Sequence, residues 1–206
     1  MRIAVVSEVS ARERNAAILD ALRPFGHEVL NAGMNGEGGG PELTYIHTGF
    51  IAAALLNLNA VDLIVGGCGT GIGFLNSVLQ YPGVTCGLLV DPLDAFLFSQ
   101  INAGNCVSLA LNKGYGWAGE VNLACVFEKL FEKAPGGGFP PHRSASQAQS
   151  RETLRMVSRA AHRPFDEIVA ALDLEIVRRT LSHEPFARII AENGYRYFEG
   201  FSEGTI

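Results

Sequence analysis

Short apolar runs alternate with longer stretches of helical period over the first 133 residues. The runs are rich in β-branched residues, as buried strands are, and lie at residues 3–6, 28–31, 62–66, 84–90 and 106–109. Stretches typical of helices lie at residues 11–25, 44–57, 72–80, 92–103 and 116–133. This alternation predicts an α/β fold: a three-layer, doubly wound, five-stranded parallel sheet of the Rossmann-like kind. Ligands then bind beyond the carboxyl ends of the strands.

A glycine- and proline-rich segment at residues 134–141 ends this alternation. It cannot continue a helix, so it marks a boundary or an extended arm. Beyond it we predict helices at residues 147–161, 164–182 and 184–193, which are too few to bury a core of their own. The sequence therefore predicts an α/β domain over residues 1–143 and a helical C-terminal extension over residues 144–206, packed on the sheet domain or on a partner subunit.

The composition of the 206 residues is that of an ordinary globular protein, with 48% hydrophobic residues and a net charge of −5. The acidic balance argues against binding to nucleic acid or to an anionic membrane. The chain opens directly on a strand-like run, and no stretch of 18 apolar residues occurs, so we expect a cytoplasmic protein. None of the four cysteines forms a C-x-x-C pair, and no cluster of ligating residues occurs. We therefore expect no metal and no other cofactor.

The strongest chemical signal is the turn Cys68-Gly69-Thr70-Gly71-Ile72-Gly73, which joins a buried strand to a helix. Its glycines allow a ligand to approach the backbone, and free N–H groups at a helix start suit a phosphate or an oxyanion. A helix N-terminus favours the thiolate form of a nearby cysteine, so Cys68 could act as a base or a nucleophile rather than as a buried structural residue. Thr70 could bind a substrate oxygen or simply cap the helix.

This hexapeptide, followed by Tyr81-Pro82-Gly83-Val84, resembles the ribose-5-phosphate isomerase B and galactose-6-phosphate isomerase family over about residues 1–143. The resemblance implies an aldose–ketose isomerase of a phosphorylated sugar, acting as a homo-oligomer (dimer or tetramer) whose sites are shared between subunits. By resemblance, Cys68 is the base that moves a proton between C1 and C2. Thr70 and the N–H groups of Gly69, Gly71 and Gly73 would stabilise the cis-enediolate.

Several positions depart from the family pattern. Where the first strand of the family ends in Ser-Asp-His, this chain has Ser7-Glu8-Val9, so Glu8 keeps a carboxylate for sugar hydroxyls while an imidazole is lost. The histidine that the family uses to open the sugar ring is replaced by Ile101, whereas Asn102 is retained.

Four further candidates come from the same comparison of patterns. Arg143 could contact the anionic group of the substrate, and the neighbouring His142 could restore acid–base capacity. Tyr45 and His47 stand where the family has a Tyr-Pro-Asp segment near its site, so His47 could supply the missing imidazole.

Alternative functions remain open at this point. The loss of the ring-opening histidine suits an open-chain substrate, such as a tetrose phosphate. Cys68 could instead be a covalent nucleophile in acyl transfer. The chain could also be a non-catalytic relative that binds a sugar phosphate.

Overall fold

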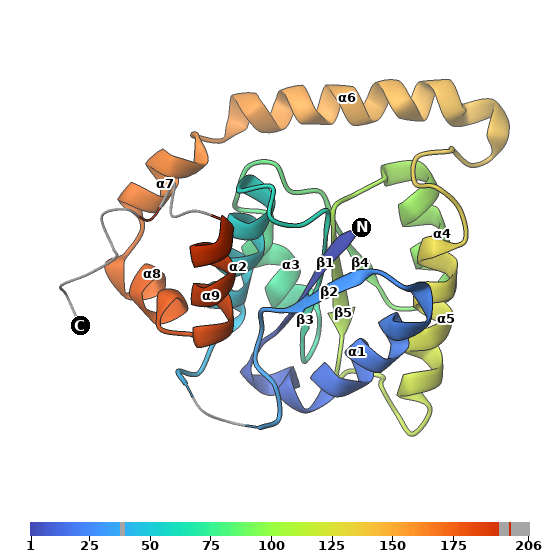
Figure 1. The fold of residues 1–206 in the computed structure, drawn as a ribbon. Coiled ribbons are helices and arrows are strands. Elements are labelled where there is room, and N and C mark those ends of the chain that lie inside the picture. Colours follow the sequence, from blue (N-terminus) through green and yellow to red (C-terminus); the bar gives the residue numbers. More distant parts are fainter. Residues whose placement is uncertain (38–39, 194–197, 199–206) are drawn as a thin grey trace.

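A five-stranded parallel sheet forms the centre of the molecule, in the order β2-β1-β3-β5-β4 (Figure 1). The computed structural model describes residues 1–37, 40–193 and 198. Its strands are β1 (Arg2–Ser7), β2 (Glu28–Asn31), β3 (Leu63–Cys68), β4 (Cys86–Leu89) and β5 (Cys106–Ala110). Neighbouring strands pair in parallel, which confirms the predicted sheet. The strand order reverses between β1 and β3, the point at which such sheets bind ligands.

Helices cover both faces of the sheet and complete the three predicted layers (Figure 1). One face carries α1 (Asn15–Leu22), which is flanked by the 3₁₀ helices η1 (Val9–Arg14) and η2 (Arg23–Phe25), together with α4 (Pro92–Leu97) and α5 (Gly119–Phe131). The other face carries α2 (Tyr45–Asn57) and α3 (Ile72–Val78). Because side chains alternate along a strand, Leu63 and Val65 of β3 enter the first core, and Ile64 and Cys68 enter the second.

The predicted helix at residues 92–103 is two elements rather than one. α4 leads without a break into a π-helix, η3 (Phe98–Asn102), which ends where Ala103 adopts a left-handed backbone with φ of +45°. Gly104 follows, and a Cβ at that position would lie 2.2 Å from Phe98 Cζ. The close approach of this glycine to the Phe98 ring makes the sharp exit into β5 possible.

The prediction of one helix over residues 164–182 is wrong. Leu172 is extended, with ψ of 156°, and separates α7 (Phe165–Ala171) from α8 (Leu174–Leu181). The side chain of Asp173 accepts a hydrogen bond from Glu175 N at 2.9 Å and so caps α8. Aspartate competes for backbone N–H groups, which explains why a new helix begins here.

The tail begins with η4 (Pro141–Arg143) and the long helix α6 (Ser144–Ala161), which runs across the amino edge of the sheet (Figure 1). α6 buries none of its residues, and Leu154, Met156 and Val157 are exposed. Arg151 ties it down by donating to Ile101 O at 2.9 Å and to Gly136 O at 3.1 Å. Within the described part of the chain, no helix combines the length and the apolar character needed to cross a membrane.

Of the remaining tail helices, α8 packs against α2 and α9 (Glu184–Asn193) packs against α8, while α7 reaches α2 through Phe165. Phe50 of α2 lies at the centre of this contact, with ring centroids 6.0 Å from Tyr81, 6.1 Å from Phe165 and 6.0 Å from Phe198. Of the two expected locations, this part of the tail therefore occupies the one on the sheet domain.

We predict that Phe50→Ala lowers the free energy of unfolding by about 3–5 kcal/mol, because it leaves a cavity where the tail meets α2. Trp117→Ala is the matched control: Trp117 is 96% exposed, and its loss should change stability by less than about 0.5 kcal/mol. Urea unfolding followed by circular dichroism measures both. Equal effects of the two variants would contradict the packing described above.

Candidate active site

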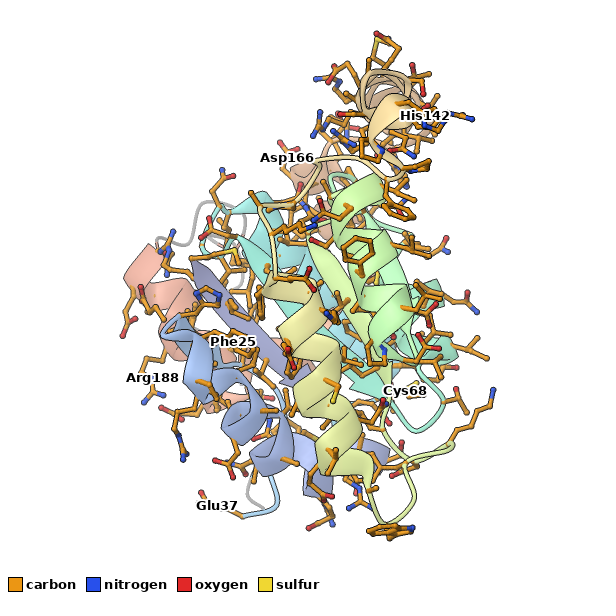
Figure 2. All side chains as sticks on the ribbon, turned by 90° about the vertical axis from the view of Figure 1, so that its right-hand side faces the viewer. Phe25, Glu37, Cys68, His142, Asp166 and Arg188 are labelled. Carbon is orange, nitrogen blue, oxygen red and sulfur yellow. The ribbon has the colours of Figure 1, made fainter. Side chains whose placement is uncertain are left out.

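The ends of β1 and β3 bring two predicted site residues to one level at the carboxyl edge of the sheet. Ser7 pairs with Gly67, so Glu8 and Cys68 follow side by side at the point where the strand order reverses. Glu8 is only 4% exposed, and Cys68 is only 5% exposed. Figure 2 shows Cys68 at this end of the sheet, far from His142 at the other end.

The turn after Cys68 depends on the backbone of Gly71, which is left-handed with φ of +75°. A Cβ at this position would lie 2.5 Å from Leu88 Cδ1 and 3.1 Å from Ala110 N, so only glycine fits between the neighbouring strands. The buried Ser108 Oγ donates a hydrogen bond to Gly71 O at 2.6 Å. The turn is therefore fixed from β5 as well as from its own strand.

Thr70 is placed to give a hydrogen bond at this turn. Its Oγ1 accepts from the N–H of Ile72, the first residue of α3, at 3.3 Å and lies 3.8 Å from Cys68 Sγ. Since the backbone N–H uses a lone pair of the oxygen, the hydroxyl proton can still be donated to the sulfur or to a bound oxyanion. Gly71, and not Thr70, occupies the N-cap position of α3, so the expectation that Thr70 is the helix cap is wrong.

Two of the glycine N–H groups already have partners within the protein. Gly69 N donates to Ser10 Oγ at 3.1 Å, and Gly71 N donates to Cys68 O at 3.2 Å. Ser10 also donates its hydroxyl proton to a carboxylate oxygen of Glu8, so it links the ends of β1 and β3. Sequence reasoning missed Ser10, although its place two residues after Glu8 was a signal.

The loop after β5 closes over the same turn. Asn112 N and Lys113 N donate to Gly69 O at 3.0 and 2.8 Å, and Asn112 Nδ2 donates to Ser10 O at 2.7 Å. Neither residue was predicted, yet both lie within three residues of the end of the buried strand β5, where such sheets bind ligands.

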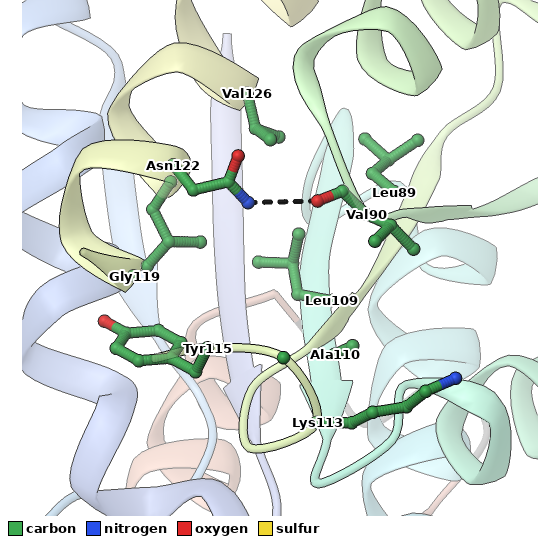
Figure 3. Close-up of a pocket in the computed structure, with 11 residues that line it drawn as sticks. Leu89, Val90, Leu109, Ala110, Lys113, Tyr115, Gly119, Asn122 and Val126 are labelled. Atoms are coloured by element: carbon green, nitrogen blue, oxygen red, sulfur yellow. Dashed lines mark hydrogen bonds between the residues drawn. The ribbon is translucent and has the colours of Figure 1, made fainter. Parts of the chain in front are cut away.

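A small cavity of about 60 Å³ opens beside this loop, at the carboxyl ends of β4 and β5 (Figure 3). Asn122 Nδ2 donates to Val90 O across it at 3.0 Å, and Lys113 extends away from Tyr115. Burial, followed by the charge of Glu120, raises the pKa of Tyr115. The cavity has room for a few water molecules only. Among the described residues, no group of His, Cys, Asp and Glu could hold a metal ion.

The first turn of α2 lies against the start of α3. A Cβ on Gly73 would lie 2.9 Å from Tyr45 Cδ1, so the tyrosine ring covers this glycine. His47 is in the same turn, but both of its ring nitrogens have partners. Nδ1 accepts from Thr44 N at 3.1 Å, and Nε2 lies 3.5 Å from Glu175 Oε2.

Asn102 and Arg143 are not brought to Cys68 within one subunit. Asn102 ends η3 before β5 begins, and Arg143 lies beside His142 at the start of α6. Both are therefore at the amino edge, whereas Cys68 is at the carboxyl edge. A five-residue strand such as β5 spans roughly 16 Å, which separates the two edges.

A sequence model of the ribose/galactose isomerase family matches residues 3–131. The chain belongs to this family. A crystal structure of 4-deoxy-L-threo-5-hexosulose-uronate ketol-isomerase in complex with a tartrate is 38% identical, with a TM-score of 0.90 over 94% of this chain and 92% of that one. A ribose-5-phosphate isomerase from Vibrio parahaemolyticus is 42% identical, with a TM-score of 0.89 over 94% and 92%.

The ketol-isomerase and the Vibrio enzyme each match 94% of this ribose/galactose isomerase family member. Both matches therefore extend over most of its helical tail. A type B ribose 5-phosphate isomerase from Leishmania infantum shares the fold at 16% identity, with a TM-score of 0.65 over 78% of this chain and 98% of that one. The chain is therefore an isomerase that acts on a sugar.

We predict that Ser108→Ala lowers the free energy of unfolding by about 0.5–1.5 kcal/mol, because Gly71 O loses the hydrogen bond from this hydroxyl and keeps only the one from Leu75 N at 3.1 Å. Ser150→Ala on α6 is the control, since it removes an exposed hydroxyl that bonds Ser146 O. Chemical denaturation of both variants provides the measurement. A neutral Ser108→Ala would mean that β5 does not hold the turn.

Proposed function

We propose that this isomerase interconverts an aldose and a ketose through a cis-enediolate, with Cys68 as the base. The observation that carries the proposal is the placement of Cys68 Sγ 3.8 Å from Thr70 Oγ1 at the strand-order reversal. The Cys68 thiolate takes a proton from the carbon next to the carbonyl. The electron pair moves to the carbonyl oxygen, and the proton returns to the former carbonyl carbon. A second proton passes between the two oxygens, so no external oxidant or reductant is needed.

Thr70 would stabilise the charge that develops on the substrate oxygen, because its hydroxyl proton is not used in the contact with Ile72 N. Glu8 and Ser10 lie on the other side of Gly69 and would bind sugar hydroxyls. Tyr45 would form the wall of the site over Gly73.

The substrate that we propose first is a phosphorylated sugar in its open-chain form. Ile101 cannot exchange protons, so its presence in place of a ring-opening histidine favours a substrate that does not cyclise. Lys113, on the loop bonded to Gly69 O, offers an ammonium group for an anion. A uronate is the second candidate, because the 38% identical ketol-isomerase is named for a hexosulose-uronate, which bears a carboxylate in place of a phosphate.

Asn102 and Arg143 would serve the site of a neighbouring subunit. Their place at the amino edge keeps them from the Cys68 of their own chain, while both are exposed. A homodimer that sets the amino edge of one chain against the carboxyl edge of the other would complete two equal sites. Arg143 would then supply a second cation for the anionic group of the substrate.

The decisive test is proton NMR in D₂O with open-chain tetrose phosphates, pentose phosphates and 4-deoxy-5-hexosulose-uronate. We expect the wild type to place deuterium at the carbon next to the carbonyl of one class. Cys68→Ala should lower that rate by at least about a thousandfold, and Thr70→Ala by about a hundredfold.

The control is the thermal unfolding midpoint of each variant, which should stay within a few degrees of the wild type. Exchange that persists in Cys68→Ala would overturn the role of the thiolate. An absence of exchange across the panel by the folded wild type would favour acyl transfer or a non-catalytic binding function.

Subunit complementation tests the shared site. Cys68→Ala and Asn102→Ala proteins, each inactive alone, are mixed in equal amounts and refolded together. Half of the dimers are then mixed and carry one intact site, so we expect about a quarter of the wild-type rate. A mixture as inactive as its components would show that both residues act within one chain.

A further inference from the structure

Both nitrogens of the buried His47 ring have hydrogen-bond partners, and the partner of Nδ1 indicates the tautomer. Thr44 N is a donor, so Nδ1 at 3.1 Å must be an acceptor and the ring proton is on Nε2. Together with the Thr44 side chain, which accepts from the backbone of His47, this contact forms a capping box at the start of α2. Nε2–H therefore points to Glu175 Oε2, 3.5 Å away.

The turn that His47 caps is a wall of the proposed substrate site. Val9 N donates to Leu43 O at 2.8 Å, which holds the entrance to α2 beside Glu8. One residue into the helix, the ring of Tyr45 lies against Gly73. A shift of this turn would therefore move Tyr45 relative to the Cys68–Gly73 turn.

Glu175 belongs to the tail, outside residues 3–131 that the family pattern matches. Its position is nevertheless well defined. Asp173 caps the helix at Glu175 N, and an ion pair joins the Glu175 carboxylate to Arg179. Val177 on the inner face of α8 is fully buried. The tail thus presents one carboxylate to the first turn of α2.

We propose that Glu175 is a positioning residue of the isomerase site, which acts through His47 to hold the first turn of α2, and Tyr45 with it, against Gly73. This inference rests on the proposed function. The Glu175 side chain is 51% exposed, so the effect is moderate: about a fivefold rise in KM with kcat within about twofold.

The test compares Glu175→Ala, His47→Asn and the double variant. Asparagine keeps an acceptor near the place of Nδ1 for Thr44 N but lacks the Nε2–H group. If the carboxylate acts through His47, all three proteins show the same rise in KM, because each lacks the same contact. Glu184→Ala is the matched control, since it removes an i,i+4 ion pair with Arg188 from the neighbouring helix α9. Additive effects of the two single changes, or an equal effect of Glu184→Ala, would overturn the proposal.

Amide NMR of the free protein separates this inference from the proposed function. Glu175→Ala and His47→Asn should shift the Tyr45 and Gly73 resonances in the same way, and Glu184→Ala should leave them in place. If the wild type isomerises no sugar but these shifts occur, the function fails while the structural link stands. If the wild type is active and the Tyr45 and Gly73 resonances do not move, the link itself is wrong.

Discussion

The left-handed backbone of Gly71 is the constraint on which the site depends. β3 can turn directly into α3 only where a residue without a side chain lets Leu88 and Ala110 approach the backbone. Ser108 then fixes the Gly71 carbonyl from the neighbouring strand. A turn held from two strands keeps Cys68 and Thr70 in a fixed relation. Fixed donors and bases lower a reaction barrier because they do not have to be reorganised in the transition state.

Some hydrogen-bond donors of this turn bond within the protein, and one is left for a substrate. The N–H groups of Gly69 and Gly71 hold the turn together through Ser10 and the Cys68 carbonyl. The hydroxyl of Thr70 does both, since its oxygen accepts from Ile72 N and its proton is left to donate. Two backbone donors of the turn therefore fix its shape, and the donor that we propose for the substrate is the Thr70 hydroxyl.

The fold was predictable because it follows from local patterns, whereas the long-range contacts around the candidate site were not. Alternating β-branched runs and helical stretches identify a parallel sheet, and the glycines after β3 mark its active edge. Ser108 and Glu175 have no local signal, because each acts across 37 or more residues on a distant backbone or ring. The location of Asn102 was readable from strand polarity: a residue before a strand lies at the amino edge. A match of motifs alone does not say at which edge of the sheet a residue lies.

The polarity of the parallel sheet also explains how the tail relates to the proposed site. Residues that follow strands and residues that precede them lie at opposite edges, so one subunit holds the Cys68 turn at one edge and Asn102 at the other. The tail starts at the amino edge, where Arg151 bonds the Ile101 carbonyl, and returns to the carboxyl edge, where Glu175 meets His47. One continuous extension thus touches both halves of what we propose to be a shared site. The contact between Phe50 and Phe165 anchors the tail between these two hydrogen-bonded points. A displacement of α7 and α8 would therefore alter the contacts of the tail at both edges of the sheet.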